Sequence, residues 1–171
     1  MADLLVKLYN LPDATPYLQK LREQSLYVRQ AHPGEKRIIS EWVLQHFPQS
    51  WAVGCEYAIE RDPISCYIAV EIEAGFAPTS NLYHLPPEKL VGFACYDVAS
   101  KGMFGAMGVQ ENYQGKGIGR ALLLQSLQAM ARERYAYAII GWAGAIEFYQ
   151  KTVAATLIED SEPGIFRGQL H

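Results

Sequence analysis

The sequence contains one short segment whose glycines and cations are suited to bind an anion. Gly115, Gly117 and Gly119 alternate with other residues at the point where an apolar run, a polar turn and a second apolar run follow one another. The first N–H groups of a helix have no acceptor within the helix, and the helix dipole makes that end positive. Glycines there let a phosphate approach the bare backbone, and Lys116 and Arg120 add positive charge. The segment therefore predicts a phosphate site.

Three phosphate-binding patterns compete for this segment. A dinucleotide fingerprint has glycines at its first, third and sixth positions, and it fails because Arg120 occupies the sixth. A Walker loop fails because Gly117 follows Lys116 where serine or threonine is required. The third pattern, Gln/Arg-x-x-Gly-x-Gly/Ala, is met in full by Gln114, Gly117 and Gly119. The spacing favours the third pattern.

At these residues the sequence resembles the GNAT superfamily of N-acetyltransferases, in which this motif cradles the pyrophosphate of acetyl-CoA. Residues 90–94 are similar to the family's third strand, 105–109 to its fourth and 138–141 to its fifth. Residues 147–151 resemble the helix that carries the family's catalytic tyrosine, here Tyr149. The resemblance extends over residues 26 to 170.

The resemblance implies that acetyl-CoA is the co-substrate and that the acceptor is a primary amine of a small molecule, a peptide or a protein; no metal is expected to take part. The acetyl group would pass directly to the amine in a ternary complex. Tyr149 would act as the general acid, because a tyrosine with a reference pKa of about 10 keeps its proton until a thiolate of about 8.5 develops. A backbone N–H near Val109 would hold the thioester oxygen. The implied cofactor-binding residues are Met107, Gly108, Val109, Gln114, Gly115, Lys116, Gly117, Ile118, Gly119 and Arg120.

Two departures from the family pattern leave a second function open. Gly141 and Trp142 stand where the family often has an asparagine at the end of its fifth strand, and Ala154 replaces the glycine expected after the tyrosine helix. No residue is identified as the general base, although Glu71, Asp97 and Glu111 are candidates. These features favour the alternative of a non-catalytic acyl-CoA-binding or sensing domain.

Several of these residues also have a purely structural interpretation. Tyr149 can pack in the core, and Lys116 and Arg120 can belong to a solvated helix face. Trp51, Cys55 and Trp142 can line an acceptor pocket, but buried packing is the favoured interpretation of these three. The identity of the acceptor does not follow from the sequence.

Helices and strands alternate around the motif, which predicts a mixed α/β fold. Period-2 and apolar runs predict strands at 4–9, 26–31, 66–72, 90–98, 103–109, 135–142, 156–159 and 165–170. Helical periodicity predicts helices at 15–24, 33–47, 51–59, 115–134 and 145–151. Residues 74–88 have the composition of a loop. The resemblance implies a twisted, mostly antiparallel sheet of about seven strands flanked by helices, with a V-shaped split between the fourth and fifth core strands.

Length and composition limit the remaining possibilities. The 171 residues predict a single domain, 1–171, with a strand and helix added at 1–24 and a core at 25–171. Half of the residues are apolar, which is enough for a core, and a net charge of −3 excludes a nucleic-acid surface.

The remaining composition bears on the cellular compartment of the protein and on whether it binds a metal. Three scattered cysteines and four scattered histidines fit neither a disulfide framework nor a metal site. No apolar run reaches the ~20 residues of a membrane span, and no signal peptide is recognised. We therefore expect a soluble, cytoplasmic protein, and the resemblance is compatible with a homodimer.

Overall fold

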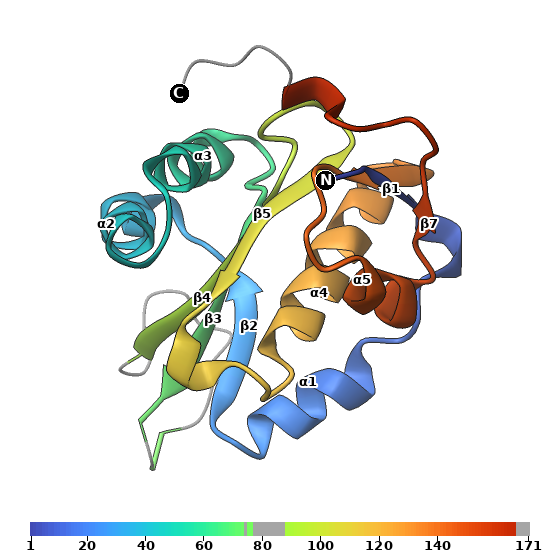
Figure 1. Ribbon diagram of the computed structural model, residues 1–171. Helices are drawn as coiled ribbons and strands as arrows, with labels where there is room; N and C mark the ends of the chain where they lie inside the picture. Colours follow the sequence, from blue (N-terminus) through green and yellow to red (C-terminus); the bar gives the residue numbers. More distant parts are fainter. Residues whose placement is uncertain (74, 77–87, 167–171) are drawn as a thin grey trace.

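The computed structural model describes residues 1–73, 75–76 and 88–166, and in these residues seven strands form one open sheet (Figure 1). The strand order is β2-β3-β4-β5-β6-β1-β7, and all neighbours are antiparallel except β5 and β6, which are parallel. The strands are β1 (Leu4–Lys7), β2 (Leu26–Gln30), β3 (Cys66–Ile72), β4 (Glu88–Tyr96), β5 (Met103–Val109), β6 (Tyr137–Ile140) and β7 (Thr156–Leu157). The predicted mixed, mostly antiparallel sheet is confirmed.

Helices cover both faces of this sheet. Helices α2 (Lys36–His46) and α3 (Gln49–Glu60) lie on one face, while α4 (Ile118–Arg132) lies on the other beside α1 (Thr15–Arg22) and α5 (Ile146–Val153) (Figure 1). Two apolar clusters result, one between the sheet and α4, and one between the sheet and the α2–α3 pair.

Close packing of α4 on the sheet depends on Gly92 in β4. A Cβ at this position would lie 3.3 Å from Ile118 Cγ2, 3.3 Å from Leu122 Cδ1 and 3.1 Å from the carbonyl oxygen of Gly108. Ile118 and Leu122 are one helical turn apart and fully buried. A larger residue at position 92 would push α4 away from the strand that carries Gly108.

Strands β5 and β6 separate to form a fork. Met103 pairs with Ile139 and Phe104 with Ile140, after which β6 ends while β5 continues to Val109. This fork is the V-shaped split expected between the fourth and fifth core strands. It opens toward the N-terminus of α4.

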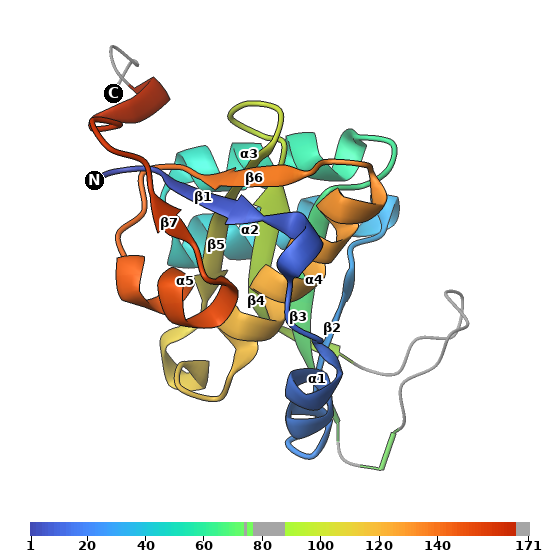
Figure 2. The same cartoon turned by 90° about the vertical axis from the view of Figure 1, so that its right-hand side faces the viewer.

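The N-terminal strand is an inner strand of the sheet. Figure 2 shows β1 between β6 and β7, and its residues Leu4 and Leu5 pair with both neighbours. The segment 1–24, which the sequence sets apart as an addition, therefore contributes to the same sheet as the rest of the chain.

Several predicted boundaries are corrected by the structure. Residues Leu8–Asn10 form a 3-10 turn instead of extending the first strand, and Gly164–Phe166 form another where a strand at 165–170 was expected. The left-handed φ of +67° at Gly164 turns the chain out of an extended course. Residues 167–170 lie outside the described residues, as does nearly all of the predicted loop at 74–88, whose last residue, Glu88, begins β4. Among the described helices, none is long and apolar enough to cross a membrane.

Candidate functional site

The edge of β5 that faces the fork carries backbone groups without a strand partner. Gln110 N donates to the carbonyl of Val91 in β4 at 2.9 Å. Along an antiparallel ladder, successive residues point their N–H groups alternately toward and away from the partner strand. Gly108 therefore faces β4, whereas Met107 and Val109 face the fork, where β6 has ended. Within the described residues, no strand pairs with the fork-facing edge of β5 beyond Phe104, although β4 pairs with its other edge.

The turn between β5 and α4 requires two of its glycines. Gly115 has a φ of +77° and Gly117 a φ of +92°, values that side chains with a Cβ rarely adopt. Gly117 is the N-cap of α4, and its carbonyl accepts the helix's first backbone bond from Ala121 N at 3.2 Å. The N–H groups of Ile118 to Arg120 precede that bond, and their usual acceptors four residues back lie outside the helix. The turn thus presents them as an anion seat.

The side chain of Gln114 supports the same turn. Its Nε2 donates to the carbonyl of Val109 at 3.3 Å, which satisfies one of the two polar groups of Val109 at the fork. The N–H of Val109 remains available there. Gln114 thereby ties the end of β5 to the glycine turn.

Two exposed cations lie at the N-terminus of α4, each over a tyrosine ring. Lys116 Nζ is 5.6 Å from the centroid of Tyr113, and Arg120 Cζ is 5.0 Å from that of Tyr17 in α1. Lys89 Nζ also lies over Tyr113, at 5.2 Å. Such contacts between a cation and an aromatic ring contribute roughly 0.5–1 kcal/mol at exposed sites. These contacts hold positive charge beside the anion seat. The sequence offered no signal for the role of Tyr17, because Tyr17 lies about a hundred residues before Arg120 in the chain.

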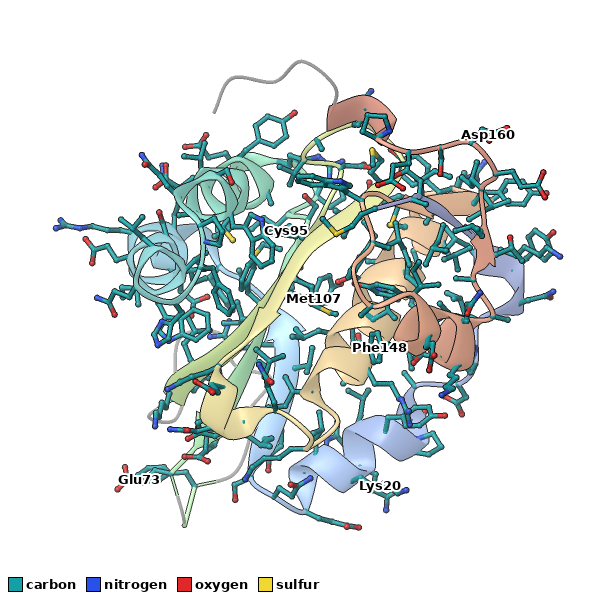
Figure 3. All side chains as sticks on the ribbon, viewed as in Figure 1. Lys20, Glu73, Cys95, Met107, Phe148 and Asp160 are labelled. Atoms are coloured by element: carbon teal, nitrogen blue, oxygen red, sulfur yellow. The ribbon has the colours of Figure 1, made fainter. Side chains whose placement is uncertain are left out.

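Side chains from β5 and α5 meet α4 at Gly119. A Cβ at Gly119 would lie 3.8 Å from Met107 Cε and 3.9 Å from Phe148 Cζ, and Figure 3 shows both of these side chains between their elements. Three of the sequence-predicted elements, 105–109, the glycine helix and the tyrosine helix, are therefore brought together. Of the other predicted residues, those from Gln114 to Gly117 lie in the adjoining turn, and Ile118 and Arg120 lie in the first turn of α4.

Tyr149 follows Phe148 on α5. Its ring is half-buried and packs edge-on against that of Phe148, with centroids 5.1 Å apart. Burial raises the pKa of the Tyr149 hydroxyl above its usual value. In the part of the chain that the structure describes, this hydroxyl forms no hydrogen bond, so its proton is not committed to another residue.

A cavity of about 340 Å³ adjoins the fork on the side of α3. It is lined from α3 by Ser50, Trp51 and Gly54, from β4 and the following hairpin by Cys95, Val98 and Ala99, from β5 by residues 103–106, and beyond β6 by Gly141 and Trp142. Trp51 and Trp142 therefore line a pocket, against the favoured interpretation of buried packing. Cys55 is fully buried and does not line it.

The three candidate bases are not among the residues that line this cavity. Asp97 is buried and forms an ion pair with Arg61 at 3.1 Å, and Glu71 accepts a hydrogen bond from Tyr113 Oη at 3.2 Å. Glu111 is exposed in the 3-10 turn before the glycines. Asp97 is thus part of a structural network, and none of the three carboxylates lines the cavity.

Three buried thiols form a cluster that sequence spacing did not predict. Cys66 pairs with Cys95 across β3 and β4, Cys55 of α3 lies over them, and the three sulfurs are within 4.8 Å of one another. Figure 3 shows Cys95 on the side of the sheet that α3 covers. Hydrogen bonding to Cys55, together with burial, raises the pKa of the Cys66 and Cys95 thiols. Such a donor set suits soft metals, and the expectation that no metal takes part stays a prediction.

Comparison with known proteins agrees with this geometry. Residues 63–152, more than half of the chain, match the family model of the acetyltransferase (GNAT) domain. No curated protein matches the sequence.

Solved structures with the same fold are distant in sequence. A glucosamine N-acetyltransferase region of a fungal multi-domain GH3 β-N-acetylglucosaminidase superposes with a TM-score of 0.69 at 11% identity, over 92% of this chain and 19% of the other. A GCN5-related N-acetyltransferase from Sphaerobacter thermophilus gives 0.64 at 19%, over 92% and 48%. A GCN5-related N-acetyltransferase-like protein from Streptococcus suis gives 0.55 at 14%, over 93% and 58%. The chain thus spans less than two thirds of each.

The matched region contains the fork, the glycine turn and Tyr149. The structural neighbours share the open sheet with its helices on both faces. The chain therefore belongs to the GNAT acetyltransferase family.

Proposed function

We propose that this chain is an acetyl-CoA-dependent N-acetyltransferase that transfers the acetyl group directly to a primary amine in a ternary complex. One observation carries the proposal. The unpaired edge of β5 at the fork leads through one short 3-10 turn, Glu111–Tyr113, into the glycine turn at the N-terminus of α4. A cofactor with an extended, amide-containing arm that ends in a pyrophosphate matches this order of backbone hydrogen-bonding groups along the chain.

The cofactor would bind along this path. The amides of its pantetheine arm would pair with the backbone of Met107 and Val109, beside Gly108, which the Phe47 ring covers from the other face. The pyrophosphate would accept hydrogen bonds from the N–H groups between Gly115 and Arg120, including those of Lys116, Gly117, Ile118 and Gly119. Anion binding at a helix N-terminus combines free donors with the helix dipole.

The chemistry requires a proton donor and a stabilised oxyanion. The amine nitrogen attacks the thioester carbon, the new N–C bond forms, and the C–S bond breaks as the tetrahedral intermediate collapses. A fork-facing N–H of β5 would stabilise the oxyanion. Tyr149 would give its proton to the leaving sulfur and regain one from water, while the amine loses its extra proton to water. The raised pKa of Tyr149 keeps this proton available across the physiological range.

The cavity beside the fork would hold the acceptor. Its lining includes Gly105 and Gly141, the residues that follow the last paired positions of β5 and β6. An amine in the cavity would therefore reach the fork from the side of α3, opposite to α4.

A non-catalytic acyl-CoA-binding domain is the second candidate. It is favoured by one observation, that no aspartate, glutamate or histidine among the described residues lines the cavity. Such a domain would bind acetyl-CoA through the same turn and transfer nothing.

Calorimetry and thiol release separate these candidates. We expect acetyl-CoA to bind in calorimetry and free CoA thiol to be released when a reactive amine is added. Binding without thiol release across a broad amine panel would favour the sensing domain. If acetyl-CoA does not bind at millimolar concentration, both candidates are wrong.

A further inference from the structure

We infer that the acceptor is an aromatic primary amine that enters the cavity as its uncharged free base. This inference rests on the proposed function and names its substrate class. It is carried by the chemistry of the residues that line the cavity at the fork.

The cavity has aromatic walls in fixed positions. Trp51 comes from α3 and Trp142 from the segment that follows β6. The Trp51 ring stacks on Phe47 with centroids 5.5 Å apart and an interplanar angle of 21°, and it meets Phe93 edge-on at 6.1 Å. A ring of the acceptor can pack against such walls with roughly 0.5–1.5 kcal/mol per aromatic pair beyond its area burial.

The cavity is also small. Its volume of about 340 Å³ lies at the lower end of the roughly 300–1,000 Å³ of small-molecule sites. Gly54 sits where α3 approaches the hairpin, because a Cβ there would lie 3.1 Å from Val98 Cγ1. This volume suits one or two rings with a short arm, and it is too small for an oligosaccharide.

No charge compensates an ammonium group in this cavity. In the part of the chain that the structure describes, its lining residues are all uncharged, and Ser50 supplies the one side-chain hydroxyl. Moving an ammonium from water into such a site costs several kcal/mol, which exceeds the roughly 0.5–2 kcal/mol of a contact with an aromatic face. The amine must therefore lose its proton before it enters.

This requirement separates two classes of amine. An amino group bonded directly to an aromatic ring is neutral at pH 7, whereas an alkylamine resembles lysine, with a pKa of about 10.4. An aryl amine thus arrives ready to form the N–C bond as the C–S bond breaks. It then loses one proton to water, while Tyr149 protonates the sulfur.

The test compares initial rates of thiol release with three amines, aniline, 2-phenylethylamine and 1,4-diaminobutane. At pH 7 we expect kcat/KM for aniline to exceed that for the diamine by about tenfold or more, and a tenfold ratio corresponds to a free-energy difference of about 1.4 kcal/mol. Between pH 7 and 9 the rate with 2-phenylethylamine should rise about tenfold per unit as its free base increases, while the rate with aniline should stay nearly flat.

A variant of the wall provides the second measurement. Trp142→Gly removes the ring and keeps the left-handed φ of +52° at this position accessible. We expect a loss of about five- to tenfold in kcat/KM for aniline with an unchanged Kd for acetyl-CoA. Tyr57→Leu, on the exposed face of α3, removes an aromatic ring outside the cavity and should change neither value.

Failure of this inference can be told from failure of the proposed function. If acetyl-CoA does not bind, the proposed function is wrong. If acetyl-CoA binds and the diamine is acetylated as efficiently as aniline, or if Trp142→Gly acts equally on both amines, the acceptor class alone is wrong. If acetyl-CoA binds and no amine reacts, the binding of acetanilide is measured by the quenching of tryptophan fluorescence. Quenching that is lost in Trp142→Gly would support the cavity assignment. Unchanged fluorescence in the wild type would overturn it.

Discussion

The carboxylate of Asp3 accepts a hydrogen bond of 2.8 Å from the backbone N–H of Trp142, 139 residues further along the chain. Trp142 has a φ of +52°, a left-handed conformation that costs roughly 1–3 kcal/mol for a bulky residue unless its surroundings enforce it. The neighbouring residue, Ala143, donates its N–H to the carbonyl of Ala2 at 2.9 Å. The residues that precede β1 therefore fix the backbone of one wall of the cavity.

Asp3→Ala should loosen this wall while leaving the cofactor path intact. We expect an increase of several-fold in KM for the acceptor, no change in Kd for acetyl-CoA, and a loss of about 1.5–3 kcal/mol in the free energy of unfolding, the range for a hydrogen bond to a charged group. Steady-state kinetics and urea unfolding measure these values. Glu159→Ala, which removes an exposed carboxylate, is the matched control. An unchanged acceptor KM in Asp3→Ala would remove Asp3 from this positioning role.

Gly117 and Gly119 should respond differently to alanine, although both belong to the motif. Gly117→Ala places a Cβ at a φ of +92° and should lower both the free energy of unfolding, by about 1–2 kcal/mol, and the affinity for acetyl-CoA. Gly119 has helical geometry, and its Cβ would make only ordinary contacts with Met107 and Phe148. Gly119→Ala should therefore retain acetyl-CoA binding and add up to about 1 kcal/mol of stability. Equal loss of binding in both variants, measured by calorimetry, would contradict the left-handed turn as the cause.

Tyr149→Phe should separate catalysis from binding. It removes the proposed proton donor and keeps the packing against Phe148, so kcat should fall by about 10²–10⁴-fold with an unchanged Kd for acetyl-CoA. Because burial raises the pKa of Tyr149, the acid stays protonated and the wild-type rate should not decline with pH until above its ordinary value near 10. Tyr57→Phe, at an exposed position of α3, should leave both constants unchanged. A wild-type rate in Tyr149→Phe would exclude the acid role.

The sequence predicted the elements whose signal is local. The β-forming run at Cys66–Ile72 and the strand at Met103–Val109 have the predicted bounds, because their apolar side chains and flanking turn residues define them without reference to distant strands. The glycine turn was also recognised from the spacing of Gln114, Gly117 and Gly119, although the helix predicted from residue 115 begins only at Ile118, after the left-handed residues Gly115 and Gly117. Its recognition led directly to the fold.

Features that depend on long-range contacts could not be predicted in the same way. The position of β1 between β6 and β7, the cluster of Cys55, Cys66 and Cys95, and the contact of Asp3 with Trp142 join residues that are distant in the sequence. Only the register of the sheet and the packing of α3 bring them together. The sequence pattern identifies what such residues are, but the tertiary structure decides what they face.

Asp97 shows this difference for a single carboxylate. It was a candidate base, but its Oδ2 lies 3.1 Å from Arg61 Nη2 and accepts the hydroxyl of Tyr135 at 2.8 Å, while its Oδ1 accepts Gly102 N at 2.7 Å. Arg61 also lies 3.4 Å from Glu133 of the turn after α4. The network joins the end of α3, the β4–β5 hairpin and the end of α4.

Asp97→Asn should destabilise the fold without acting on the chemistry directly. The substitution leaves the partly buried Arg61 without its nearer carboxylate, while the carboxylate of Glu133 remains. We therefore expect the free energy of unfolding to fall by about 3 kcal/mol, the lower end of the range for a broken buried ion pair. Glu41→Gln breaks the exposed pair with Arg37 and should cost less than about 0.5 kcal/mol. Burial and the bond to Asp97 raise the pKa of Tyr135 to about 12, so wild-type stability should fall as pH rises from about 10 toward 12, because the unfolded chain releases this proton first. Urea unfolding measures each effect, and equal losses in the two carboxylate variants would show that the buried network does not support the hairpin.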